Sequence, residues 1–162
     1  MKYAIVYSSK TGNTGRLAQT LKETLPPEDC LYCGGPDARA LEAEVLYVGF
    51  WTDKGTCDGE TAAFLRTVTN QQVFLFGTAG FGGAPEYFAQ ILRRVEETLP
   101  AGARVIGRYM CQGRMPAGVR RRYEAMEESG KRQMLLDNFD RALSHPDQAD
   151  LEGLRRAVGP KE

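Results

Sequence analysis

Six residues near the start of the chain bring hydroxyl, amide and glycine chemistry into one loop. The stretch is Ser9-Lys10-Thr11-Gly12-Asn13-Thr14, and it directly follows the apolar segment 3–7. It also precedes a segment of helical periodicity that begins near Gly15. Free backbone N–H groups and positive partial charge gather at the N-terminus of a helix, where they favour an anion. The loop therefore predicts a phosphate site, and a tight turn with a simple helix cap is the plainer alternative.

Two further loops each combine an aromatic residue with glycines. The first covers residues 49–58 and follows an apolar run, and the second covers residues 77–83 and follows another. Their candidate contact residues are Trp51, Asp53, Lys54, Gly55, Thr78, Ala79, Gly80, Phe81 and Gly82. Glycines allow the backbone to come close to a ligand, and loops carry function more often than the elements that they connect. We expect a flat ring system between these two loops, with its phosphate in the first loop.

Apolar runs and helical stripes alternate along the chain and would position the three loops. Strands are expected at 3–7, 30–33, 45–50, 73–76 and 105–111, and helices at about 15–25, 58–68, 85–99 and 134–143. The runs at 45–50 and 73–76 lack polar alternation, as strands covered on both faces do. The alternation predicts an α/β fold with right-handed crossovers and a doubly wound parallel sheet. The carboxyl ends of its strands share one edge, so the three loops are expected to meet there.

Length and composition predict one domain. The chain has 162 residues, and we assign 1–162 to a single domain with a core over about 2–111 and a helical C-terminal extension over 113–162. It has 21 basic and 21 acidic residues, which gives no sign of a nucleic-acid partner. No apolar run approaches the length of a membrane span, and the N-terminus enters a short strand rather than a signal peptide. These features predict a cytoplasmic protein without a membrane partner.

The cysteine and histidine content argues against a metal site. The four cysteines are Cys30, Cys33, Cys57 and Cys111, and the single histidine is His145. Residues three apart in a strand face opposite sides, so the thiols of Cys30 and Cys33 would diverge. We therefore expect reduced, structural cysteines and no bound metal. The role of Cys57, either in packing or as a thiol beside the ligand, is left open.

The loop at 9–14 resembles the hydroxyl-x-Thr-Gly-x-Thr motif of flavodoxins, which holds the phosphate of flavin mononucleotide (FMN). Segments 49–58 and 77–83 correspond to the two isoalloxazine-binding loops of that family, and the order of elements agrees from residue 2 to about 111. The resemblance implies a single flavodoxin-like sandwich with helices on both faces of a five-stranded parallel sheet. It also implies the strand order 2-1-3-4-5, with FMN bound noncovalently at the switch point.

The resemblance implies a role for each residue of the first loop. Ser9, Thr11 and Thr14 would donate hydroxyl hydrogen bonds to the phosphate. Backbone N–H groups would come from Lys10, Gly12, Asn13, Thr14 and Gly15.

The resemblance also assigns the ring contacts. Gly55 would provide the peptide that turns over on reduction to bond the flavin N5, and Phe81 would stack on one ring face. Trp51, Asp53 or Lys54 would cover the other ring face or lie at its edge. For Trp51, a place in the hydrophobic core is an equal alternative. No side chain need act as a catalyst, because the flavin supplies the redox chemistry.

By resemblance the protein is an electron carrier between a reductase and an acceptor protein. The alternatives are a small FMN-dependent reductase that acts on a small molecule, and a flavin-free binding module on the same fold. The formal net charge of +0 departs from the strongly acidic carriers of the family, as does a basic stretch at 113–130. The sequence leaves the partners and the oligomeric state open.

Overall fold

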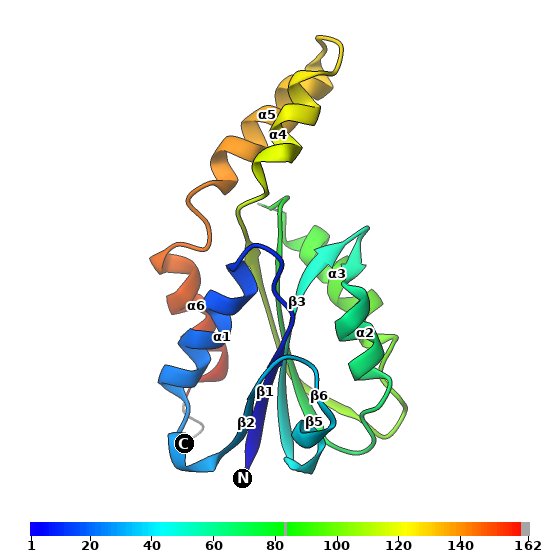
Figure 1. Ribbon diagram of the computed structural model, residues 1–162, viewed down its shortest axis with the longest axis vertical. Coiled ribbons are helices and arrows are strands. Elements are labelled where there is room, and N and C mark those ends of the chain that lie inside the picture. The colour runs from blue at the N-terminus through cyan, green and yellow to red at the C-terminus, as the bar shows by residue number, and fades with distance from the viewer. Residues whose placement is uncertain (83, 160–162) are drawn as a thin grey trace.

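Apolar runs form the central parallel sheet of the computed structural model, which describes residues 1–82 and 84–159 (Figure 1). The parallel strands are β1 (Tyr3–Tyr7), β2 (Cys30–Gly34), β3 (Val45–Asp53), β5 (Gln72–Ala79) and β6 (Arg104–Gln112). Their spatial order is β2-β1-β3-β5-β6, with the short strand β4 (Thr56–Cys57) paired antiparallel to the end of β3. Numbered without β4, this is the expected order 2-1-3-4-5, so the doubly wound α/β fold is confirmed.

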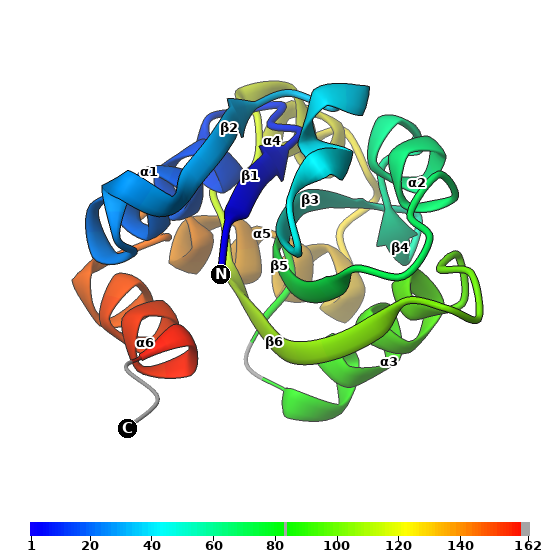
Figure 2. The same ribbon diagram turned by 90° about the horizontal axis from the view of Figure 1, so that it is seen from below.

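Helices cover both faces of the sheet. One face carries α1 (Asn13–Thr24) and α6 (Gln148–Val158), and the other carries α2 (Gly59–Leu65) and α3 (Pro85–Glu96) (Figures 1 and 2). Two 3-10 turns, η1 (Pro27–Asp29) and η2 (Ala38–Glu42), flank β2. Each helix packs through an apolar stripe, as amphipathic helices on a sheet do.

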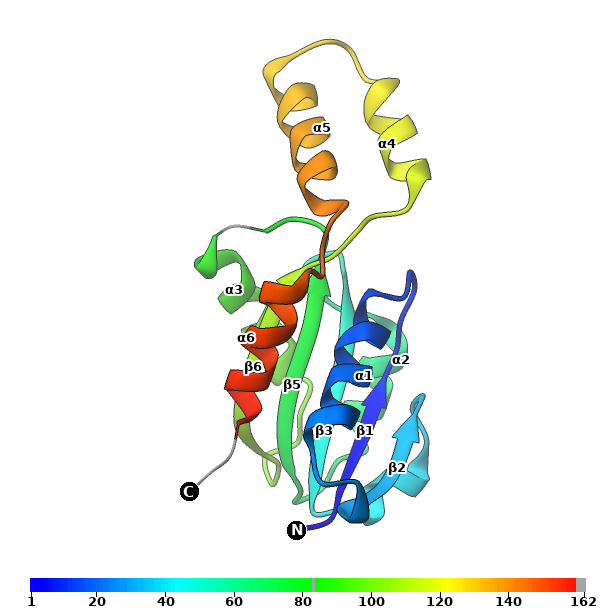
Figure 3. The ribbon, with the colours of Figure 1, turned by 90° about the vertical axis from the view of Figure 1, so that its left-hand side faces the viewer.

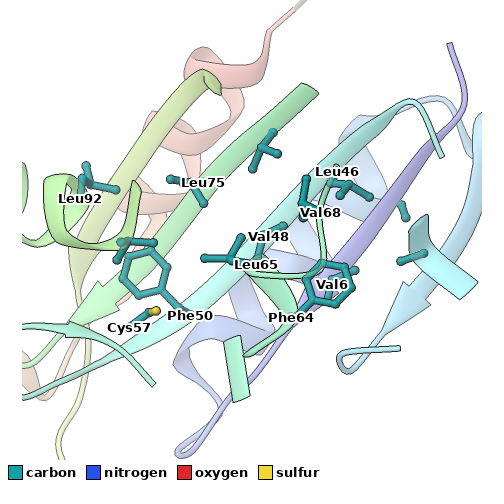
Figure 4. Packing of buried hydrophobic residues seen from close by; sticks show 14 of the residues in the cluster. Val6, Leu46, Val48, Phe50, Cys57, Phe64, Leu65, Val68, Leu75 and Leu92 are labelled. Carbon is teal, nitrogen blue, oxygen red and sulfur yellow. The ribbon is translucent and has the colours of Figure 1, made fainter. Parts of the chain in front are cut away.

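Alternate residues of each strand fill two separate cores, because successive side chains of a strand point to opposite faces. Ile5 lies with Leu17 of α1 in one core. Val48 and Phe50 lie with Leu65 of α2 in the other, where all three side chains are fully buried (Figure 4). The two layers hold the carboxyl ends of β1, β3 and β5 in fixed positions relative to one another.

Two further helices form a projecting arm, a name we use for α4 (Ala117–Glu124) and α5 (Gly130–Ala142). Figures 1 and 3 show the arm standing beyond the carboxyl ends of the strands. The chain then returns through α6, whose Leu151 and Leu154 are buried in the same core as α1. The expected extension at 113–162 thus divides into the arm and a helix of the sandwich itself.

Helix α6 was not predicted from the sequence, although a helix-capping pattern marks its N-terminus. Asp147 and Asp150 form a reciprocal capping box, in which each carboxylate accepts a hydrogen bond from the backbone N–H of the other. None of the helices within residues 1–82 and 84–159 is long and apolar enough to cross a membrane.

Candidate functional site

A cleft of about 220 Å³ lies where the loops after β1, β3 and β5 meet. Nine of the predicted contact residues line it: Lys10, Thr11, Asn13, Trp51, Asp53, Lys54, Thr78, Ala79 and Gly80. The structure therefore brings the three predicted segments together at one edge of the sheet. Two of them are partly strand, because β3 continues to Asp53 and β5 to Ala79, beyond the expected ends at residues 50 and 76. Six others, Ser9, Gly12, Thr14, Gly55, Phe81 and Gly82, are not part of its lining.

The loop after β1 is shaped by its own hydrogen bonds. Gly12 has a φ of +91°, a left-handed conformation that favours glycine. The Ser9 hydroxyl oxygen accepts from the backbone N–H groups of Gly12, at 3.1 Å, and of Gly15, at 3.2 Å. Within the described residues, the N–H groups of Thr11, Asn13 and Thr14 donate to no protein acceptor. These donors at the N-terminus of α1 suit an anionic group.

The hydroxyl of Thr14 does not face the cleft, whereas the resemblance implied that it would bind the phosphate. Its side chain is fully buried, and its hydroxyl donates to the Phe50 carbonyl at 3.0 Å. The same hydroxyl lies 3.3 Å from that of Thr78. The side chain of Thr14 therefore ties α1 to β3 and β5 rather than facing the cleft, because it points inward from the first turn of the helix.

The base of the arm packs against the first loop. The Asn13 amide donates to the carbonyl of Arg114 at 2.8 Å, and the Thr11 hydroxyl lies 3.5 Å from the same oxygen. A Cβ atom on Gly113 would come within 2.5 Å of the Asn13 amide nitrogen, so this close approach requires glycine. The first loop and the arm thus share one boundary of the cleft.

Residues after β6 complete the cleft and were not predicted. Gly113, Arg114, Met115 and Pro116 line it together with Thr52. Residues 113–116 could have been predicted to line the cleft, because they follow the carboxyl end of a parallel strand, as the predicted loops do.

The second loop is a tight hairpin between β3 and β4. Lys54 and Gly55, at its tip, have φ values of +53° and +85°. Positive φ at both central residues is the geometry of a type I′ turn, which suits two-residue hairpins. The Lys10 ammonium lies 4.9 Å from the centre of the Trp51 ring. Trp51 is half-buried, and it lies at the cleft rather than in either core, so it is not core filler; its contact with a flavin stays a prediction.

The third loop is held by two side-chain amides, of which Asn138 is buried and Gln112 is half-buried. The Gly80 carbonyl accepts from Gln112 at 2.9 Å and from Asn138 of α5 at 3.1 Å. Phe81 is 37% exposed, and it makes an edge-to-face contact with Tyr87, with 6.5 Å between the ring centres. Its stacking on a flavin stays a prediction.

Cys57 belongs to the core. Its side chain is buried among apolar residues that include Phe50 (Figure 4). Burial, with a smaller contribution from the negative charge of Asp58, raises the pKa of the Cys57 thiol to about 11. The thiol is therefore neutral near pH 7, and its role is packing.

The cleft combines groups that can hold an anion with groups that can hold a flat ring. It offers free N–H donors at the start of α1, a half-buried indole, and glycine-rich backbone at Gly80, within one opening. The residues present fit a phosphate beside the first loop and a flat ring beside the other two.

Comparisons with known proteins agree with this architecture. A flavodoxin-like domain-containing protein BilS of Clostridium symbiosum is 39% identical over 172 residues, with 93% of this chain and 90% of that relative covered. A short-chain flavodoxin associated with a bacterial microcompartment superposes with a TM-score of 0.55 at 18% identity, over 88% of this chain and 96% of that one. A Fusobacterium nucleatum flavodoxin bound to FMN gives 0.52 at 16% identity, over 86% and 95%. The model of the flavodoxin domain matches residues 4–159, and this chain belongs to that family.

Proposed function

We propose that this protein binds FMN noncovalently in the cleft and carries electrons between a reductase and an acceptor protein. The observation that carries the proposal is the meeting of three loops, from the neighbouring strands β1, β3 and β5, in one opening. Bound FMN would supply reversible electron transfer, and the protein would supply binding, orientation and electrostatics.

The residues of the chain would hold and tune the cofactor. Thr11 and the N–H groups of Asn13 and Thr14 would hold the phosphate, where the positive end of α1 favours negative charge. Trp51 would lie against the ring system. Lys54 at the hairpin tip would favour an anionic reduced ring by charge attraction.

A comparison of flavins tests the binding site. The purified apoprotein is titrated with FMN, FAD and riboflavin, and binding is followed by visible absorption and quenching of flavin fluorescence. FMN should bind at least about tenfold more tightly than riboflavin, because riboflavin lacks the phosphate and its charge-assisted hydrogen bonds. Equal affinity for FMN and riboflavin would refute the phosphate site, and no binding of any flavin would favour a binding module.

A second measurement separates a carrier from an enzyme. NADH or NADPH is added to the FMN-loaded protein, and the flavin absorption is followed without any partner. A carrier should keep its oxidised spectrum until a reductase is supplied, whereas rapid bleaching by the nicotinamide alone would contradict the carrier.

One observation favours a small FMN-dependent reductase as the second candidate. A hollow of about 490 Å³ lies beneath the arm and shares Thr11 and Arg114 with the cleft. Met115, Phe139 and Leu143 give it an apolar lining that a small molecule could occupy beside the flavin. Rapid bleaching in the measurement above would support this candidate.

A further inference from the structure

Charge is unevenly distributed over the molecule although its formal net charge is +0. The lining of the cleft and of the hollow beneath the arm includes two acidic residues, Asp53 and Glu124, and five basic ones. The basic ones are Lys10, Lys54, Arg114, Arg120 and Arg121. Subtracting both sets from the 21 basic and 21 acidic residues of the chain leaves 16 basic and 19 acidic elsewhere. The lining of the two openings is therefore net positive, and the rest of the chain taken together is net negative.

Most of this positive charge is not neutralised by neighbours. Arg120 forms ion pairs with Glu124 and Asp140. The other four basic residues, which we call the cationic rim, are exposed and form no ion pair within residues 1–82 and 84–159. Asp53 is the one carboxylate of the cleft lining itself. Exposed charges without partners act on approaching molecules at a distance of several ångströms.

The four charges of the rim come from four separate segments. They lie on the first loop, the β3–β4 turn, the segment after β6 and helix α4. The four charged groups are therefore spread around the openings of the cleft and of the hollow rather than directed at one point. That arrangement suits a broad charged surface better than a small ion, which needs convergent donors.

Apolar side chains accompany the rim at the same end of the molecule. Met134 of the arm is 57% exposed, Leu143 directly after the arm is 44% exposed, and Phe81 is 37% exposed. Helix α4 has no fully buried residue, although it contains Val119 and Tyr123. Figure 3 shows the arm standing clear of the sandwich beyond the carboxyl ends of the strands. Protein interfaces are enriched in methionine, arginine and aromatic residues of this kind.

We propose that the cationic rim is a docking surface for an acidic face of a protein redox partner. The inference rests on the proposed function, because docking there would place the partner against the edge of the cleft that holds FMN. Arg114 lines both the cleft and the hollow, so a partner that contacts it lies beside both openings. Opposite charge would steer the encounter and orient the two proteins.

The test compares one acceptor protein in two charge forms. The FMN-loaded protein is reduced with dithionite and mixed in a stopped-flow instrument with ferric cytochrome c, which is basic, or with its succinylated form, which is acidic. Each ferric haem takes one electron from the reduced flavin and becomes ferrous, which changes its absorbance. At 10 mM salt we expect the acidic acceptor to be reduced at least about tenfold faster, and the difference should disappear at 1 M salt.

Two double variants locate the effect. Arg114→Glu with Arg121→Glu reverses two charges of the rim and should abolish the preference for the acidic acceptor. Lys22→Glu with Arg66→Glu makes the same change in net charge, on exposed residues at the ends of α1 and α2 that lie at the opposite edge of the sheet. This control should keep the preference. If the first pair disturbs folding or FMN affinity, Arg121→Glu alone is compared with Lys22→Glu alone.

The outcomes separate this inference from the proposed function. Failure to bind FMN refutes the proposed function before the docking test begins. If FMN binds and passes electrons, equal rates for both acceptors, a preference for the basic one, or equal effects of the two double variants would overturn the docking proposal. A parallel run with ferricyanide controls for a small-anion site: if its rate falls in Arg114→Glu/Arg121→Glu as strongly as that of the acidic protein, the rim is not a protein docking surface.

Discussion

The guanidinium of Arg94 on helix α3 donates a hydrogen bond of 2.9 Å to the carbonyl oxygen of Gly55, at the tip of the β3–β4 hairpin. The bond holds that peptide carbonyl toward α3. A Cβ atom on Gly55 would lie 2.8 Å from the same guanidinium nitrogen, so the contact also depends on glycine. We therefore expect Arg94 to act as a positioning residue for this peptide, which the flavodoxin resemblance places next to the flavin N5.

Replacing Arg94 with alanine should raise the first-electron potential of bound FMN. The carbonyl of Gly55 would then be free to turn toward a protonated N5, which stabilises the reduced ring. A hydrogen bond of about 0.5–1 kcal/mol corresponds to roughly 20–40 mV for one electron. Spectroelectrochemical titration measures the potential, and Arg93→Ala, which changes the exposed neighbour on the same helix, is the control. An unchanged or lower potential in Arg94→Ala would contradict this role.

Replacing Lys54 with glutamate should lower the second-electron potential. Reversing the charge at the hairpin tip disfavours an anionic reduced ring, and in water two unit charges 4 Å apart interact by about 1 kcal/mol. The expected change is on the order of 50 mV. The same titration measures it, with Lys22→Glu at the end of α1 as the control for net charge. A rise in potential would show that Lys54 does not act through its charge.

Substitutions of Thr11 and of Thr14 should have separate effects, the first on FMN binding and the second on the stability of the fold. Thr11→Val removes an exposed hydroxyl of the cleft and should weaken FMN binding about tenfold, with the stability of the apoprotein unchanged. Thr14→Val removes the buried donor to the Phe50 carbonyl and should lower the free energy of unfolding by about 1–3 kcal/mol.

Fluorescence titration with FMN and urea unfolding of the apoprotein measure the two effects. If Thr14→Val weakened FMN binding without loss of stability, the hydroxyl of Thr14 would face the phosphate after all, as the resemblance implied.

Stability should fall with alkaline pH, partly through Cys57. Burial raises its pKa from the ordinary value of 9.0 to about 11, so between these values the unfolded chain has lost a proton that the folded chain keeps. The contribution is complete below pH 9 and is lost as the pH rises toward 11, by up to about 1.4 kcal/mol per pH unit. Urea unfolding from pH 7 to 10.5 measures the slope. Cys57→Ala should have a shallower slope than the parent protein, and an identical slope would exclude Cys57 as a contributor.

Several features of the site could be predicted because they depend on neighbours along the chain. The loop at 9–14 follows a buried strand directly, and the segments 49–58 and 77–83 cover the carboxyl ends of the next two central strands, β3 and β5, and the chain after them. Since parallel strands end at one edge of a sheet, local apolar runs were enough to bring these loops together. The direction of a side chain was not predictable in the same way. Thr14 turns inward because Phe50, 36 positions away, presents its carbonyl there.

The sequence by itself determined the alternation of strands and helices and the meeting of the three loops, because apolar periodicity and turn residues act over short stretches. The family and the strand order 2-1-3-4-5 followed from the resemblance of the loop at 9–14 to the flavodoxin motif. Only the tertiary structure decided that α4 and α5 stand out as an arm while α6 returns to the sheet. It also decided the contacts of Arg94 with Gly55 and of Asn13 with the Arg114 carbonyl, which join residues 39 and 101 positions apart. Such contacts depend on how whole elements pack, and no local pattern of residue types specifies them.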